Sequence, residues 1–138
     1  MTDHAAPAPE SPALRQIEEI VPHQILARVA DLVGAGARFM TITCLDQDDR
    51  FELYYHFDVD GSVLSLHTFV PRAASLPSIS GVCFCAFLVE NEVKELFGLN
   101  ITDIAIDYQG HLLLAEGMTP TPMARFPRNG SAESCAGA

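Results

Sequence analysis

Two stretches of the chain space their apolar residues as a helix does when it buries one face. The first covers residues 22–33; it starts at Pro22, which suits a first helical turn, and stops before Gly34. The second covers residues 83–97, and Gly98 stands where a left-handed cap residue would end it. The apolar face of the first helix consists of Ile25, Leu26, Val29, Leu32 and Val33. The stripe of the second consists of Ala86, Val89, Val93 and Leu96.

Residues 51–70 read as two strands joined at Asp60-Gly61, a residue pair that favours a two-residue type I′ hairpin. That turn predicts a register and two faces. The core face consists of the pairs Val59–Ser62, Phe57–Leu64 and Tyr55–Leu66. The opposite face consists of Glu52, Tyr54, His56 and Asp58 with Val63, Ser65, His67 and Phe69. Because one hairpin is not stable alone, we expect both helices to cover its apolar side.

Weaker alternation predicts three more strands. Residues 38–45 form one, with Met40, Ile42 and Cys44 on the same side. Residues 104–108 and 111–114 are the other two, and residues 71–82 are a connector. Residues 1–13 are predicted to be a disordered lead and residues 117–138 an extended or disordered tail, since both are rich in proline and small residues. One domain is therefore expected over residues 14–116.

Charge and length exclude several classes of protein. The chain has 138 residues, a formal charge of −10 and a single lysine, Lys94. Such a surface repels phosphate backbones and anionic lipid headgroups, which excludes nucleic-acid binding and polybasic membrane attachment. No apolar stretch has the length of a membrane span and no secretory signal precedes the domain, so a cytosolic chain with reduced cysteines is expected.

The C-terminal half of the second helix is unusually acidic, reading Glu90-Asn91-Glu92-Val93-Lys94-Glu95-Leu96-Phe97-Gly98. Glu90 and Lys94 are four residues apart, in the order that favours pairing. That pairing does not explain acids at the end of a helix, where the macrodipole disfavours negative charge. Two interpretations remain open: a solvated acidic face, or carboxylates that a partner protein requires.

Three blocks of this sequence, within residues 37–98, resemble the 30 kDa subunit family of respiratory complex I. The first block contains Phe51, Glu52, Leu53, Tyr55 and His56, the second Ser78-Ile79, and the third Ala86, Glu90, Glu92, Phe97 and Gly98. The chain departs from the family pattern at Leu88 (usually Trp), Asn91 (Arg), Glu95 (Asp) and Leu112 (Pro). It is also short and poor in arginine, which resembles the equivalent small subunits of membrane-bound energy-converting [NiFe] hydrogenases more than the NADH dehydrogenase branch.

The resemblance implies an α+β domain with a mixed sheet, a central hairpin, and helices packed mainly on one face. It implies a non-catalytic subunit of a membrane-bound oxidoreductase, located on the cytoplasmic peripheral arm at the inner membrane. The expected partners are the large catalytic subunit and a neighbouring iron–sulfur subunit, which would hold the Ni-Fe site and the clusters; this chain would hold no cofactor and would meet the membrane only through the complex. A subunit of an NADH-quinone oxidoreductase-type complex is the alternative. The residues expected at the subunit interface are Glu90, Glu92, Glu95, Phe97, Gly98 and His56.

Other chemistry has weaker support. His56 and His67 share the predicted non-core face with Glu52 and Asp58, so a metal site can be drawn there, and a free-standing metal- or ligand-binding domain is the competing function. Cys83-Phe84-Cys85 is a poor zinc half-site, and small buried thiols are the expected state. No nucleophile motif or phosphate-binding glycine loop is present, and nothing near the three glutamates implies a substrate pocket.

Overall fold

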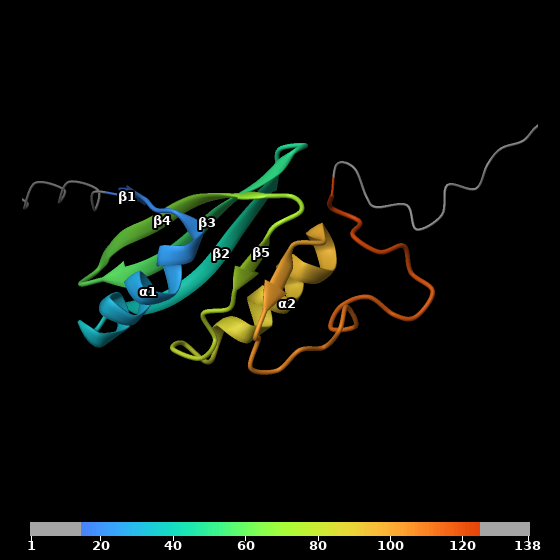
Figure 1. The fold of residues 1–138 in the computed structure, drawn as a ribbon. Coiled ribbons are helices and arrows are strands. Elements are labelled where there is room, and N and C mark those ends of the chain that lie inside the picture. The colour runs from blue at the N-terminus through green and yellow to red at the C-terminus, as the bar shows by residue number, and fades with distance from the viewer. Residues whose placement is uncertain (1–14, 125–138) are drawn as a thin grey trace, which may run out of the picture.

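The computed structural model describes residues 15–124, so the predicted lead and the last part of the predicted tail lie outside it. The elements in chain order are β1 (Gln16–Glu19), the 3₁₀ turn η1 (Pro22–Gln24), α1 (Ile25–Gly34), β2 (Arg38–Asp46), β3 (Arg50–Val59), β4 (Ser62–Pro71), β5 (Ser75–Pro77), α2 (Ala86–Phe97) and β6 (Asn100–Thr102). Four strands form one sheet in the order β1-β4-β3-β2, and β5 pairs with β6 (Figure 1). Since β1 runs parallel to β4 while the other pairs of that sheet are antiparallel, the predicted α+β fold with a mixed sheet is confirmed.

The hairpin at the centre of the sheet has the predicted register. Val59 faces Ser62, Phe57 faces Leu64 and Tyr55 faces Leu66. The two turn residues, Asp60 and Gly61, have φ of 51° and 82°, the left-handed values that a type I′ turn requires at both central positions. This tight turn makes the strand faces follow directly from the sequence.

A bulge in β2 changes one predicted face. The register against β3 shifts between Phe39 and Thr41, so Met40 is the extra residue and its side chain is 52% exposed. The prediction that Met40 shares a side with Ile42 and Cys44 is therefore wrong, and Phe39 packs against the core instead. Alternation alone could not show this, because one inserted residue reverses the face of every residue before it.

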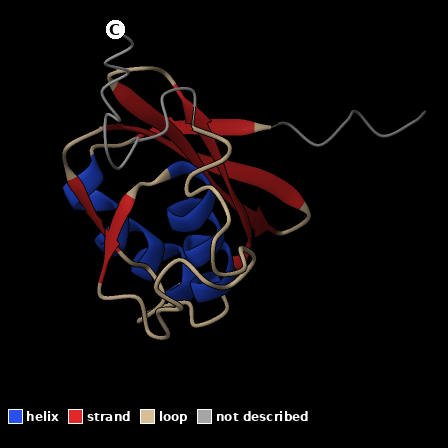
Figure 2. Ribbon diagram, turned by 90° about the vertical axis from the view of Figure 1, so that its right-hand side faces the viewer, coloured by secondary structure: helices blue, strands red, loops and turns tan. Residues whose placement is uncertain are grey.

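Both helices lie on the same side of the four-stranded sheet (Figure 2). Ile25, Val29 and Leu32 of α1 are buried in the core, as are Ala86 and Val93 of α2. The other side of β3 and β4 carries polar and aromatic residues, and we call it the open face. It consists of Glu52, Tyr54, His56, Asp58, Val63, Ser65, His67 and Phe69. The expectation that helices pack mainly on one face is confirmed.

The short strands were not predicted, and two predicted strands are absent. β1, β5 and β6 are three or four residues long and lack a clear apolar alternation. Residues 104–108 and 111–114 contain no strand, although both were predicted to be strands. Residues 117–124, the described part of the predicted tail, contain no helix or strand either. They return to α2, where the Met123 N–H donates to the Leu96 carbonyl at 2.9 Å.

Candidate functional site

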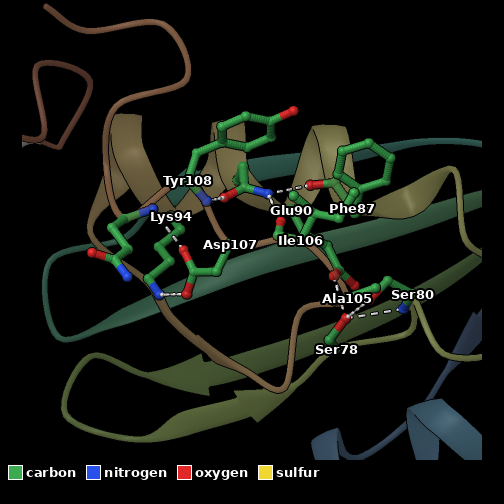
Figure 3. A network of polar contacts seen from close by, with 11 residues as sticks. Ser78, Ser80, Phe87, Glu90, Lys94, Ala105, Ile106, Asp107 and Tyr108 are labelled. Atoms are coloured by element: carbon green, nitrogen blue, oxygen red, sulfur yellow. Dashed lines mark hydrogen bonds and ion pairs between the residues drawn. The ribbon is translucent and has the colours of Figure 1, made fainter.

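Glu90 lies inside the domain, in the middle of α2, with 0% of its surface exposed. Its Oε1 accepts the Ile79 N–H at 2.7 Å, and its Oε2 accepts the Ser78 hydroxyl. The Ser78 oxygen in turn accepts the Ser80 N–H at 2.9 Å and lies 2.6 Å from the Ser80 hydroxyl (Figure 3). The Ser-Ile block and the helix acid, which are separate blocks of the family pattern, therefore meet in one buried network.

Burial raises the pKa of Glu90 above its ordinary value, and the hydrogen bonds from Ser78 and Ile79 oppose that rise. The buried phenol of Tyr55 is close enough to feel this charge: burial and the Glu90 carboxylate together raise the pKa of Tyr55. A carboxyl group enclosed in this way cannot reach a substrate without opening the domain. Its local role is to hold residues 78–80 against α2.

Glu95 is also buried, in the last turn of α2. Its carboxylate accepts the backbone N–H of Leu112 at 2.9 Å and that of Leu113 at 2.9 and 3.1 Å, and it also accepts the N–H of Leu114. Three converging N–H groups explain an acid at a helix end that the macrodipole disfavours. They also explain why residues 111–114 form no strand, because their donors are bound to a side chain.

Three further side chains attach the segment after β6 to the rest of the domain. Asn91 donates to the carbonyls of Phe87 and Ile106, both at 2.7 Å, and accepts the Tyr108 N–H at 2.9 Å. Ser80 accepts the Ala105 N–H at 2.8 Å, and Lys94 lies 2.9 Å from a carboxylate oxygen of Asp107. Lys94 therefore pairs with Asp107, and the predicted pairing of Lys94 with Glu90 is wrong. We call the group of Ser80, Asn91, Lys94 and Glu95 the α2 clamp.

The structure separates the predicted interface residues into buried and exposed ones. The solvated acidic face is wrong for Glu90 and Glu95, since the polar groups of the domain itself surround both carboxylates. Glu92 alone of the three glutamates is exposed. Phe97 packs against the core, and His56 is half-buried on the open face. A single chain does not test whether any of these residues meets another subunit, so the interface role stays a prediction.

Gly98 has a structural reason for its position. It ends α2 with φ of 81°, in the left-handed region that the sequence predicted, and its N–H donates to the Lys94 carbonyl. A Cβ at this position would lie 2.8 Å from the Thr121 side chain. A side chain here is therefore disfavoured both by the backbone conformation and by the segment that returns to α2.

The open face holds two histidines, as predicted, but they bind different partners. The His67 Nε2–H donates to Glu52 Oε1 at 2.8 Å, which also accepts the Tyr54 hydroxyl at 2.8 Å. The ring nitrogens of His56 lie 2.7 Å from the Ser65 hydroxyl and 2.9 Å from the Thr43 hydroxyl. The hydrogen bond from Tyr54, and after it the one from His67, hold the pKa of Glu52 below its ordinary value. Within residues 15–124, no three potential ligands are clustered closely enough to hold a metal ion.

A shallow pocket between α2 and the following segment is lined by Lys94, Glu95 and His111, among others. No motif or spacing in the sequence indicates this pocket. It brings a carboxylate and an imidazole to one place, but the Glu95 oxygens are occupied by backbone donors. A general acid or base must be able to exchange a proton with a substrate, and this carboxylate is held by the fold. The pocket therefore does not support catalysis.

An exposed patch of large apolar residues lies on the outer side of α2, and sequence reasoning did not identify it. Phe84 is 59% exposed and Leu88 is 49% exposed, one helical turn apart. The Phe87 ring lies 5.0 Å from that of Phe84 and 6.4 Å from that of Tyr108, measured between centroids. Figure 3 shows the Phe87 and Tyr108 rings on the side of α2 away from Ser78 and Ser80. The available signal was that Phe84 and Leu88 fall outside the apolar stripe of the helix. We call Phe84, Phe87, Leu88 and Tyr108 the aromatic patch.

The chain is similar to known proteins both in its sequence family and in its fold. The family model described as "Respiratory-chain NADH dehydrogenase, 30 Kd subunit" matches residues 19–128. One chain in the structure of the membrane-bound sulfane sulfur reductase (MBS), an archaeal respiratory membrane complex, superposes with a TM-score of 0.67 at 19% identity, over 78% of this chain and 67% of that chain. A search of curated proteins found no match.

The described residues include no helix with the length and apolar character needed to cross a membrane. The matched family consists of subunits of a multisubunit respiratory complex, which implies partner subunits. The match covers β2, β3 and β4, both helices and the α2 clamp, so it extends well beyond the three blocks seen in the sequence. This chain belongs to the family of the 30 kDa subunit of respiratory-chain NADH dehydrogenase.

Proposed function

We propose that this chain is a non-catalytic subunit of a membrane-bound oxidoreductase of the energy-converting [NiFe] hydrogenase type, that it docks against the large catalytic subunit on the cytoplasmic peripheral arm, and that it supports assembly. The observation that carries the proposal is the family match over residues 19–128. The hydrogenase branch is favoured over the quinone-reducing branch because the chain has only eight Lys and Arg residues and carries Asn91 and Leu112 where the family usually has Arg and Pro.

The aromatic patch is the surface we assign to this docking. Soluble proteins rarely leave several large apolar side chains side by side in water, and aromatic residues are enriched in the buried centres of interfaces. Glu92 is exposed on the same helix, one turn after Leu88. With a formal charge of −10 on the whole chain, the fitting partner surface is an apolar area bordered by basic residues. We assign this surface to the large catalytic subunit.

Paired substitutions test this assignment. Phe84→Ser with Leu88→Ser should reduce co-purification with the co-expressed large subunit at least tenfold, since both side chains would lose their apolar contacts. The matched control is Met40→Ser with Leu45→Ser, which removes two similarly exposed apolar side chains from β2. Wild-type recovery of the first double variant would refute the docking surface. Glu92→Lys alone should also reduce co-purification, because the new lysine would face the basic residues that border the partner surface.

The proposal includes the absence of a resident metal. The purified chain should contain no stoichiometric iron, nickel or zinc, because neither the cysteine spacing nor the two histidines supply a ligand set. Elemental analysis of protein purified without chelators provides the measurement. About one equivalent of a transition metal would favour a free-standing metal-binding domain. The genes encoded beside this chain offer a second check: a hydrogenase large subunit and antiporter-like membrane proteins are expected.

A further inference from the structure

Cys83 and Cys85 face one another in the turn that precedes α2. Their Sγ atoms are 3.5 Å apart, and both thiols are free. Cys85 is exposed and Cys83 is half-buried, so the expectation of small buried thiols is wrong for this pair. Backbone hydrogen bonds from Cys83 N–H to the Ile79 carbonyl and from Ala86 N–H to the Cys83 carbonyl hold the turn. Both sulfur atoms are thus placed together on a surface loop.

We propose that Cys83 and Cys85 form a reversible intrachain disulfide by exchange with a low-molecular-weight disulfide of the glutathione class. The Cys85 thiolate attacks one sulfur of the small disulfide, and the other sulfur leaves as a thiolate. The Cys83 sulfur, on losing its proton, then attacks Cys85 Sγ and displaces the second small thiol. The protein loses two electrons and two protons, and one small disulfide becomes two small thiols.

The local geometry permits this bond. In a helical turn, Cα atoms two residues apart are separated by about 5.4 Å, which is within the range that disulfides span. The sulfur atoms have only to close from 3.5 Å to bonding distance. A ring closed over three residues constrains the unfolded chain little and strains the folded one, and strained, exposed disulfides are the readily reduced ones. Reversibility therefore follows from the spacing.

The two cysteines are not equivalent. Burial, followed by the contact with Cys85, raises the pKa of Cys83 to about 11. Cys85, at the position just before α2, is the more exposed of the two, so an external disulfide can reach it. Attack on an external disulfide therefore begins at Cys85, and Cys83 resolves the mixed disulfide. Cys44 provides the contrast, because burial in the core raises its pKa to about 12 and no other thiol within residues 15–124 lies beside it.

The test uses the full chain with Cys135→Ser, so that the remaining thiols are Cys44, Cys83 and Cys85. After incubation with oxidised glutathione, intact mass spectrometry should show the loss of two hydrogens without a bound glutathione, and peptide mapping should place the bond at residues 83–85. Reduced glutathione in excess should restore the mass. A protein that stays fully reduced, or that retains glutathione on Cys85, would overturn the proposal.

Two single variants in the same background check the order of attack. Cys83→Ser should accumulate a stable glutathione adduct on Cys85, because no neighbour resolves it. Cys85→Ser should acquire glutathione on Cys83 at least ten times more slowly. Equal rates in the two variants would contradict attack from Cys85. Circular dichroism before oxidation confirms that each variant is folded, and Cys44→Ser serves as a variant whose substitution should leave disulfide formation unchanged. The outcome is independent of the docking proposed above, since it needs no partner subunit.

Discussion

The β3–β4 hairpin and the segment from Asp103 to Ala124 satisfy their backbone groups in opposite ways. In the hairpin, ten residue pairs continue without interruption from Val59–Ser62 to Arg50–Pro71, and backbone binds backbone. In the second segment, several N–H groups bind side chains: Ala105 to Ser80, Tyr108 to Asn91, and three leucines to Glu95. One region is held by its own periodic pairing, and the other by a few residues of another element.

This difference predicts a difference in local stability. A backbone ladder keeps its hydrogen bonds when a single surface side chain changes, whereas a segment held by a few side chains loses several bonds when one of them is removed. The core side chains of β3 are the exception, because they support the whole domain. We therefore expect global effects from the hairpin core and local effects from the α2 clamp.

Phe57→Ala should have the largest effect, lowering the free energy of unfolding by ~3–5 kcal/mol through lost burial and a residual cavity. Phe57 is fully buried and its ring lies 5.7 Å from that of Phe39. His56 precedes Phe57 and lies on the opposite face. His56→Ala should lower the free energy of unfolding by about 1 kcal/mol, because it leaves the buried Ser65 hydroxyl without this partner. Urea unfolding of both variants gives the ranking, and the reverse order would mean that the two faces are misassigned.

Glu95→Ala should have an intermediate and local effect of about 2 kcal/mol, since three backbone donors lose their acceptor while the sheet is untouched. Hydrogen exchange should become fast at Leu112, Leu113 and Leu114 and remain slow in β3 and β4. Glu92→Ala is the matched control, with a glutamate removed three residues earlier on the exposed side of the same helix.

If hydrogen exchange in Glu95→Ala became faster by the same factor at Leu112–Leu114 and in β3 and β4, the segment and the sheet would form one cooperative unit. Faster exchange in Glu92→Ala to the same extent would show that helix charge, rather than the three hydrogen bonds, controls the loop. Either result removes the contrast between the two regions.

The hairpin could be predicted from sequence because its determinants are local. Asp60-Gly61 defines a turn type, and a two-residue turn leaves one register in which Phe57 and Leu64 share a face. The family and the positions of both helices were likewise predictable. The mixed sheet was expected only from the family resemblance, because the parallel strand β1 was not predicted from its own residues. The bulge at Met40 was not, because nothing near that residue marks an inserted position.

The roles of the helix acids could not be predicted because their partners are distant in sequence. Glu90 binds residues 78–79 and Glu95 binds residues 112–114, and neither the spacing nor the periodicity of α2 indicates which face carries those donors. The same limitation explains the wrong strand at 104–108. Alternating Ile104, Ile106 and Tyr108 is compatible with a strand, but Ser80 and Asn91 accept N–H groups that a strand would use for pairing. The exposed aromatic patch depends on how this segment meets α2.

The smallest effect we predict is a change in the pH dependence of stability at Glu90, which binds residues 78–79 between the two regions in the sequence. Its pKa is raised in the folded state, mainly by burial, from an ordinary value of 4.5. As pH rises past that value, the unfolded chain releases this proton before the folded one does. The contribution of Glu90 is therefore fully present below about pH 4.5 and is lost as pH rises through the folded-state pKa.

Glu90→Gln removes that titration and keeps a side chain of similar size. The difference in unfolding free energy, wild type minus variant, should decrease between pH 4 and pH 7, and urea denaturation at several pH values measures it. Glu18, Glu52, Asp58 and Asp107, whose pKa values are lowered, act in the opposite sense and occur in both proteins, so they cancel in the difference. A difference that increases with pH would mean that the hydrogen bonds from Ser78 and Ile79 outweigh burial. Glu90 would then hold Ser78 and Ile79 against α2 in its ionised form.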